Sequence, residues 1–490
     1  MLTSGQKKSG QKKANQVFAR LSLVGFLTLF AYQAAIADSS RARISFENIP
    51  VSASEDMGTL GVHYDIKPFS GSDVYLGVGG YGALTGDRGG FFTGGVTLGH
   101  HYFLNDSVVD GLAIDAGLFA GGGGGAGAFP GGGLMLRPHL MLEKELDDFA
   151  VRFGVSRTLF PNTTNTSYEN DTHPSIGLTI PTYQFNNPNV SSSVSYKQNR
   201  ATKIVPVSMR YHPDKNAKRR SGNNLTKDIT LLGFQYQDFI NDSLYRTFET
   251  YGAGIGGTDG YAKVLAGFGV NKELIKDSVA LDAKLTLGMA GGGDIDTGGG
   301  FIVQPMIGLD INIADGWNVK PMIGKTYAPS GNFSSTTSEL GLSWTGGKGK
   351  TEYNIKNKTY YPDDSSRTKS GGLYTDRIEL LGISFSKKVN DKVRVSGSAY
   401  GAYKGDVGAY AEGLFGIEVQ PFELPIHASY EFGVGGGGGM DVGEGLIHQS
   451  TIGTRISLSQ KFDITIDLGR MKGVDGGSFA ANVLQVGVSF

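Results

Sequence analysis

The side chains best suited to chemistry in this chain are its histidines, and their spacing argues against a catalytic site. The eight histidines are scattered along the sequence, and none belongs to a Ser/His/Asp or HExxH arrangement. His100 and His101 are neighbours, but successive residues of a strand face opposite sides, so the two rings cannot hold one metal. The sequence therefore predicts no catalytic residue and no cofactor, and an enzyme is kept as a remote alternative.

A second candidate chemistry is calcium binding by acidic residues within glycine tracts. The tracts GGGDIDTGGG from Gly291 and GGGGGMDVGEG from Gly435 place carboxylates between glycines, as calcium-binding β-helix loops do. Calcium takes about six to eight oxygen ligands, and the related tract GGGGGAGAFPGGG from Gly121 has no carboxylate. Calcium binding is therefore the least supported role for the tracts. Its candidate ligands are Asp294, Asp296, Asp441 and Glu444.

The glycine tracts also allow a conformational role and a steric role. Glycine is common at loop tips and at the places where a barrel strand bends. Alternatively, the missing side chains let another backbone or a polymer approach closely, which would make the tracts part of a rim that meets a partner. The glycines chosen as rim candidates are Gly121, Gly125, Gly291, Gly300, Gly435 and Gly439.

A basic cluster is the remaining candidate site. It contains Lys215, Lys218, Arg219 and Arg220 within a long polar stretch. The cluster is either a solvated loop or a contact for lipopolysaccharide phosphates or another anionic polymer. Over the whole chain 45 basic residues balance 46 acidic ones, so no attraction to nucleic acid is expected.

The elements that position these residues are repeated three times. A DxxxLG-type strand, a Tyr/Gly strand, a glycine tract and a further strand recur in the same order. The repeat units span approximately 42–184, 200–345 and 350–490. A repeat of this length is a whole multi-strand unit rather than one coil of a solenoid.

The strands alternate apolar and polar residues. In DITIDLG, for example, Ile464, Ile466 and Leu468 alternate with polar neighbours. This pattern is typical of transmembrane β-barrels, whose sheet must close on itself in lipid. Each repeat contains about eight strands, so the sequence predicts an all-β, antiparallel transmembrane barrel of about 24 strands. A range of about 22 to 26 is allowed, because the stretch from Pro181 to Arg200 has room for two more.

A single barrel is favoured over three small barrels in tandem. The third repeat follows the second after only TGGKGK, which is as short as a hairpin and leaves no linker. The predicted domain is one barrel over residues 38–490. Three small barrels remain the alternative, because the second repeat ends in SELGLSW, which resembles the chain terminus.

The two ends of the chain carry targeting signals. Five basic residues precede an apolar run from Leu21 to Phe30, and Ala35-Ile36-Ala37 fits a cleavage site, so residues 1–37 are predicted to be a signal peptide. The last strand, VLQVGVSF, ends at Phe490. This strand resembles the C-terminal strand of bacterial outer-membrane β-barrel proteins. The resemblance implies the outer membrane of a Gram-negative bacterium, periplasmic termini, contact with lipid and lipopolysaccharide, and recognition of the Phe490 strand by the barrel-assembly machinery.

A barrel of this size predicts a wide channel. Strands about 4.7 Å apart and tilted by about 40° would give a diameter of about 45 Å. The first hypothesis is therefore an outer-membrane conduit for an exported polymer, or a barrel filled by a partner protein. The alternative is a structural or adhesive platform that binds a partner through its outer loops.

Overall fold

The computed structural model describes most of the chain. The described residues are 40–52, 55–67, 73–104, 111–127, 133–146, 149–161, 163, 171–181, 202–314, 316–345, 351–421, 425–457 and 463–489. The predicted signal peptide, the extra strands allowed before Arg200 and the terminal Phe490 lie outside them. Within these ranges no helix combines the length and hydropathy that a membrane-spanning helix requires.

The described residues form 24 antiparallel strands in three closed barrels of eight, which confirms the predicted strand number. Barrel 1 contains β1 (Ser40–Ser52), β2 (Glu55–Ile66), β3 (Val74–Thr85), β4 (Phe92–Phe103), β5 (Leu112–Gly124), β6 (Leu134–Glu145), β7 (Ala150–Arg157) and β8 (Thr172–Pro181). Barrel 2 contains β9 (Thr202–Pro213), β10 (Ile229–Phe239), β11 (Leu244–Ile255), β12 (Ala262–Ile275), β13 (Val279–Gly291), β14 (Phe301–Ala314), β15 (Trp317–Tyr327) and β16 (Ser334–Thr345). Barrel 3 contains β17 (Thr351–Pro362), β18 (Ile378–Lys388), β19 (Val393–Lys404), β20 (Ala411–Val419), β21 (Ile426–Gly436), β22 (Leu446–Ser457), β23 (Asp463–Gly473) and β24 (Ala480–Ser489).

The prediction of a single barrel is wrong. β1 pairs with β8, β9 with β16 and β17 with β24, so each eight-strand sheet closes on itself. The short connection between Thr345 and Thr351 suggested a hairpin. However, the two strands that it joins, β16 and β17, do not pair with each other: β16 pairs with β9, and β17 pairs with β24. A short connection keeps the two strands that it joins close together, but it does not determine whether these strands hydrogen-bond to each other. An eight-strand ring also has a lumen that side chains can fill, whereas a 24-strand ring would enclose a hole about 45 Å wide.

The walls of the barrels are apolar outside and polar inside. On β6, for example, Leu140 and Leu142 are 53% and 47% exposed, whereas His139 and Glu143 are buried in the lumen. Such an apolar outer belt matches the hydrocarbon core of a bilayer, and the closed sheets leave no unpaired edge in lipid. The chain therefore has the fold of an outer-membrane β-barrel protein, repeated three times.

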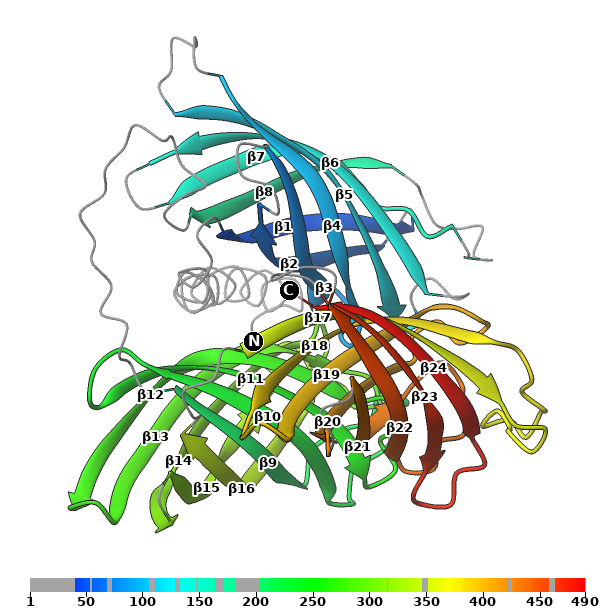
Figure 1. Cartoon of the computed structure of the whole chain (residues 1–490). Coiled ribbons are helices and arrows are strands. Elements are labelled where there is room, and N and C mark those ends of the chain that lie inside the picture. Colours follow the sequence, from blue (N-terminus) through cyan, green and yellow to red (C-terminus); the bar gives the residue numbers. More distant parts are fainter. Residues whose placement is uncertain are drawn as a thin grey trace, which may run out of the picture.

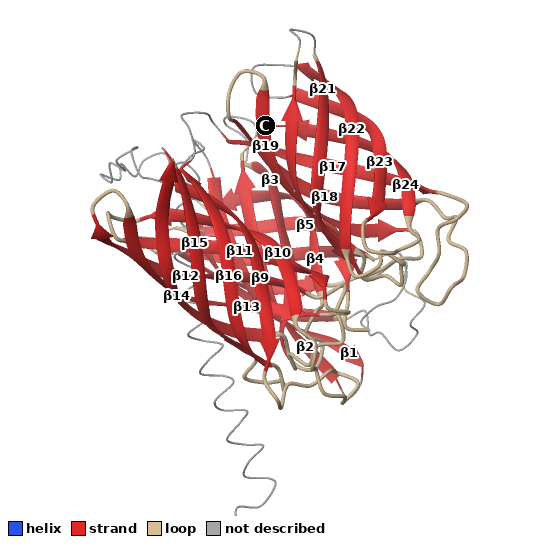
Figure 2. Ribbon diagram, turned by 90° about the horizontal axis from the view of Figure 1, so that it is seen from below, coloured by secondary structure: helices blue, strands red, loops and turns tan. Residues whose placement is uncertain are grey.

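The three barrels form a closed ring, in which each barrel touches both of the others (Figure 1). β3 of barrel 1 packs against β13 and β14, β11 of barrel 2 packs against β20 to β22, and β19 of barrel 3 packs against β4 to β6. Figure 2 shows the same barrels built from strands, with the longer loops gathered around their ends. The ring has three junctions, one for each pair of barrels.

Candidate functional site: barrel junctions and lumens

Two junctions are built from glycine backbones in close contact. A Cβ added to Gly291 at the end of β13 would lie 2.3 Å from the backbone nitrogen of Gly90 in barrel 1. A Cβ added to Gly436 at the end of β21 would lie 2.4 Å from the backbone nitrogen of Gly260 in barrel 2. Gly90 and Gly260 have φ angles of 100° and 80°, which side chains rarely allow. Any side chain at these tract positions would therefore push two barrels apart.

The third junction repeats this arrangement between barrels 3 and 1. The N–H of Ala409 donates a hydrogen bond of 3.1 Å to the carbonyl oxygen of Gly123, which lies in the first tract. A comparable bond of 3.0 Å joins Gly89 N–H to the Gly298 carbonyl at the junction of barrels 1 and 2. Each tract thus contacts the turn after the third strand of another barrel, which is β3, β11 or β19. The backbone that approaches the tracts is that of the neighbouring barrel.

A second glycine in each repeat completes the junction. The sequence Tyr-Gly-Ala occurs at 81–83, 251–253 and 400–402, and its central glycine faces the adjacent barrel. An added Cβ would lie 2.8 Å from Met289 Sδ at Gly82, 2.4 Å from Val434 Cγ2 at Gly252, and 2.5 Å from the Gly122 oxygen at Gly401. The rings of Phe234 and Phe385, 5.3 Å apart, extend the contact between barrels 2 and 3.

Most of the basic cluster is engaged in loop and junction contacts. Arg220 donates a hydrogen bond to the backbone carbonyl of Asp87 in barrel 1, and Lys218 donates to Asn224 in its own loop at 2.7 Å. Lys369 forms an ion pair with Asp259 and thereby joins barrel 3 to barrel 2. Contact of the cluster with lipopolysaccharide stays a prediction.

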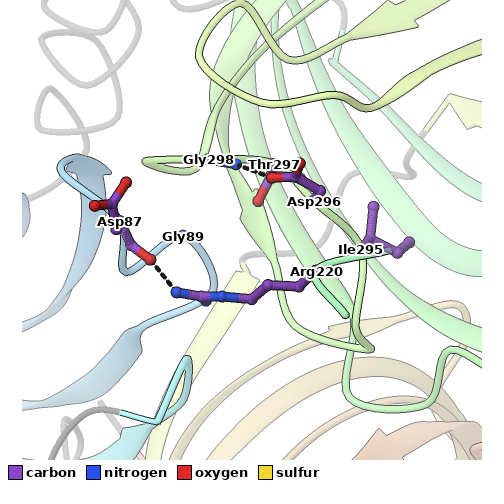
Figure 3. Close-up of a pocket in the computed structure, with 7 residues that line it drawn as sticks. All are labelled: Asp87, Gly89, Arg220, Ile295, Asp296, Thr297 and Gly298. Atoms are coloured by element: carbon purple, nitrogen blue, oxygen red, sulfur yellow. Dashed lines mark hydrogen bonds between the residues drawn. The ribbon is translucent and has the colours of Figure 1, made fainter. Parts of the chain in front are cut away.

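A small cavity lies beside the Arg220 contact (Figure 3). Its volume is about 210 Å³, and its lining comes from the Asp87 turn of barrel 1 and the second glycine tract of barrel 2. The Arg220 side chain crosses it to reach barrel 1. The cavity is therefore part of the junction.

The acidic residues proposed as calcium ligands accept hydrogen bonds from protein donors. Asp296 accepts from Asn332 Nδ2 at 2.6 Å, and Asp294 accepts from Ser221. Glu444 accepts a bond of 3.0 Å from the N–H of Gly256 across the junction of barrels 2 and 3. These oxygens hold loops and barrels together, and the geometry gives the calcium hypothesis no support.

Asp441 joins two loops at the same end of barrel 3. The N–H and hydroxyl of Ser478 donate to one of its oxygens at 3.0 and 2.7 Å. Partial burial raises the pKa of Asp441, but the hydrogen bonds from Ser478 outweigh burial and hold the pKa below its usual value. The loop contact therefore favours the ionised carboxylate.

The rim candidates divide between junctions and barrel interiors. Besides Gly291, Gly300 lies at a junction, since its added Cβ would meet the Ala83 oxygen of barrel 1 at 2.7 Å. The other four positions lie within their own repeat. Gly121 and Gly435 face aromatic side chains of their own barrel, Gly125 faces the Gly90 oxygen, and Gly439 has nothing within 4 Å.

Apolar side chains seal the end of each lumen that lies beside the glycine tracts. In barrel 2 the tract residue Ile295 pairs with Arg219 of a covering loop and is 2% exposed, and in barrel 3 Met440 pairs with Thr368 and is 0% exposed. In barrel 1 the seal is the cluster of Ile49, Val51, Met57, Tyr81, Ala83, Phe91, Phe119, Met135 and Phe160. Loops and lumen side chains together close the barrel mouths beside the tracts.

Below its seal, the lumen of barrel 1 is crossed by buried ion pairs. Arg41 donates to Asp65 at 2.9 Å and also contacts Asp115, while Arg152 lies 2.8 Å from Asp115 and 3.1 Å from Glu143. These residues come from β1, β2, β5, β6 and β7, so the pairs connect opposite walls. The charged lumen side chains are Arg41, Arg43, Arg137, Arg152, Glu47, Asp65, Asp115 and Glu143.

One group of His and carboxylate side chains among the described residues is close enough to hold a metal. It consists of His101, Asp115 and Glu143, all buried in barrel 1. The guanidinium groups of Arg41 and Arg152 already contact both carboxylates. A divalent cation would meet two fixed positive charges there, so the group is better described as an ion-pair network.

Barrels 2 and 3 contain equivalent networks built on lysine. In barrel 2, Lys284 lies 2.7 Å from Glu249 and 3.1 Å from Glu339, and all three side chains are buried. In barrel 3, Lys358 lies 2.5 Å from Glu412. Removing either partner would leave an uncompensated charge inside the barrel.

These lumen residues were not recognised from the sequence, although one signal for them was present. In each barrel a lumen cation lies over the ring of the tyrosine in the Tyr-Gly-Ala sequence. The strand that supplies this cation differs from barrel to barrel. The cation-to-ring distances are 5.0 Å for Arg137 and Tyr81, 4.2 Å for Lys263 and Tyr251, and 3.8 Å for Lys358 and Tyr400. The repeated tyrosine could have marked an inward position, but its partner depends on how the barrel closes.

No protein-family model matches the chain, and no curated protein matches it. The chain is similar in structure to the siderophore receptor PirA from Pseudomonas aeruginosa, with 10% identity over 93% of this chain and 80% of that one, and a TM-score of 0.28. It is also similar to OpdQ from Pseudomonas aeruginosa, with 8% identity over 92% and 97% of the two chains and a TM-score of 0.22.

A third similar structure is OccAB3 from Acinetobacter baumannii, with 9% identity over 92% of this chain and 98% of that chain, and a TM-score of 0.22. Likeness at this level does not bear on function. The strand pairing of the chain itself defines the three barrels.

Proposed function

We propose that the protein is an outer-membrane platform, in which three sealed barrels hold a set of outer loops in fixed relative positions. One observation carries the proposal: each lumen is filled by packed side chains and its outer end is closed by apolar residues. The wide conduit predicted from the sequence needs a 24-strand lumen, which the three closed barrels replace. A polymer therefore has no comparable passage among the described residues.

The outer loops have exposed tips that a partner could reach. The loop after β9 carries its buried contacts on Ala217 and Leu225, while residues 221–224 at its tip are exposed. The corresponding loop of barrel 3 exposes residues 369–373, and Leu373 is 60% exposed. Because the junctions fix the barrels relative to one another, these tips are presented together, as a platform requires.

The test replaces the exposed tips and leaves the seals intact. Residues 221–224 and 370–373 are exchanged for Gly/Ser segments of equal length, which keeps the junction residue Lys369, and attachment of intact cells to a surface or to other cells is measured. The matched control exchanges the turn at 241–243 on the opposite side of barrel 2. We expect the tip variant alone to lose attachment. An unchanged phenotype together with a steady open conductance of the purified protein at neutral pH would contradict the platform.

A further inference from the structure

Four histidines point into the lumen of barrel 1. They are His63 on β2, His101 on β4, His139 on β6 and His173 on β8, and none is more than 6% exposed. In the described part of barrel 2 no histidine lies in the lumen, since His212 is at the rim, and in barrel 3 the buried lumen histidine is His427. The imidazoles are therefore concentrated in one barrel.

The charges around these histidines are balanced only while the rings are neutral. Four arginines face four carboxylates in the described lumen of barrel 1, and two tyrosines complete the ionisable groups packed against His63 and its neighbours. The groups facing the histidines from the barrel wall are Arg41, Arg43, Glu47, Asp65, Tyr75, Tyr81, Asp115, Arg137, Glu143 and Arg152. Each protonated imidazole adds a positive charge that no further carboxylate offsets.

His63 connects this network to the apolar seal. Its ring packs 4.9 Å from the ring of Tyr81 and 5.4 Å from that of Phe119, both members of the seal. Nδ1 lies 3.3 Å from Thr97 Oγ1, and Nε2 is buried without a hydrogen-bond partner in the structure. A neutral ring is tolerated against two aromatic rings, whereas an imidazolium with an unpaired N–H must draw in water or an anion.

We propose that barrel 1 is an acid-opened anion channel, in which protonation of the lumen histidines breaks the outer seal at His63. The added positive charge separates the packed network and hydrates the space below Tyr81 and Phe119. The excess of arginine and imidazolium over carboxylate makes the opened lumen selective for small anions such as chloride. This activity is separate from the platform, which depends on the loops.

Barrels 2 and 3 are expected to contribute less to an acid-induced current. The described lumen of barrel 2 has no histidine, and the buried lumen histidine of barrel 3, His427, lies 2.8 Å from Asp467. Acid can therefore add more imidazolium charge to barrel 1 than to either of the other barrels.

The test is current through the purified full chain in a planar bilayer. Recordings in a potassium chloride gradient are made at a pH of about 7.5 and at a pH of about 3, far below the ordinary imidazole pKa of about 6.5, because burial disfavours the charged form of these rings. We expect closed recordings at the higher pH, and at the lower pH openings whose reversal potential approaches that of chloride. A protein that stays closed in acid, or opens with cation selectivity, overturns the proposal.

Two variants identify the barrel and the residue. His63→Phe keeps an aromatic ring in the seal but cannot be protonated, so the acid-induced current should be lost. The matched control is His100→Phe, because His100 faces outward on the strand that carries His101. If His63→Phe fails to fold, judged by heat-dependent migration in gels, His63→Gln replaces it. Equal acid currents in the folded His63 variant and the His100 variant would refute the assignment.

Discussion

Barrels 1 and 2 have the same number of strands but fill their lumens with different chemistry. Barrel 1 uses arginine and histidine, so that Arg152 reaches two carboxylates at once and His63 lies directly against the seal. Barrel 2 uses lysine with glutamine and tyrosine, and Lys284 lies between Glu249 and Glu339. Both are neutral networks that connect opposite walls, but protonation of histidine can unbalance only the first.

The lumen of an eight-strand barrel must thus be filled by side chains whose charges balance, but different residue types can meet this requirement. The junctions follow the opposite rule, because all three depend on glycine at matching positions. A lumen can be filled in many ways, whereas two backbones in contact leave room for one residue type. Lumen substitutions should therefore damage one barrel, and junction substitutions should separate intact barrels.

The largest effect is expected in the lysine network of barrel 2. Lys284→Ala leaves Glu249 and Glu339 buried together without their cation, and such a change costs about 3–5 kcal/mol. The midpoint of urea unfolding in detergent should fall, and proteolysis should cut within barrel 2 first. Lys272→Ala, at an exposed lysine of β12, is the matched control. Equal stability of the two variants would show that the buried network contributes little.

The junction between barrels 3 and 1 should be the next most sensitive region. Gly401→Leu places a side chain against the Gly122 carbonyl, and overpacking of this kind costs about 1–3 kcal/mol. Because the chain has no cysteine, spin labels can be placed at single engineered cysteines in barrels 1 and 3. The inter-barrel distance should lengthen while each barrel keeps its resistance to protease.

Gly94→Leu controls the junction experiment. Gly94 also lies on a barrel wall, but an added Cβ there meets nothing within 4 Å. Its spin-label distance should match that of the unmodified protein. A similar lengthening in both variants would mean that the loss of glycine, rather than the contact, disturbs the ring.

A smaller effect is expected for the ion pair between Lys369 and Asp259. The pair is partly exposed, so Lys369→Ala should weaken the junction of barrels 2 and 3 by only about 0.2–1 kcal/mol. The loss should shrink at high salt, which screens exposed charges. Arg220→Ala removes a contact to a backbone carbonyl instead, and its effect should depend less on salt. If the effect of Lys369→Ala on the junction did not depend on salt, the difference expected between the two variants would be contradicted.

The smallest effect concerns the loops over barrel 3. The pKa of Asp441 is lower in the folded protein than in the unfolded chain, so its stabilising effect is complete above the ordinary aspartate pKa of about 3.9. The effect is lost as the pH falls through the folded pKa. Protease cutting near residues 474–478 should therefore increase only in strong acid. Ser478→Ala should move that increase to higher pH, and an unshifted profile would exclude the contact as its cause.

Much of this architecture could be predicted from local patterns. Alternation with a period of two gave the apolar outer and polar inner faces, and the turn residues gave the strand number. The repeat placed all three tracts at equivalent connections, and close approach of another backbone was one of the three roles that the sequence allowed for them. These properties depend on residues near one another in sequence, so they can be read without knowing the fold.

Closure was decided only by the tertiary structure. Whether β16 bonds to β9 or to β17 depends on hydrogen bonds between strands more than 100 residues apart and on whether the enclosed lumen can be filled. Closure of barrel 1 placed His63 beside Phe119 across the lumen, and packing between barrels placed Gly291 against Gly90. The sequence by itself determined the strands and their two faces, because those are local properties. Three rings instead of one, and the contacts that seal and join them, follow from non-local pairing and packing that no local pattern encodes.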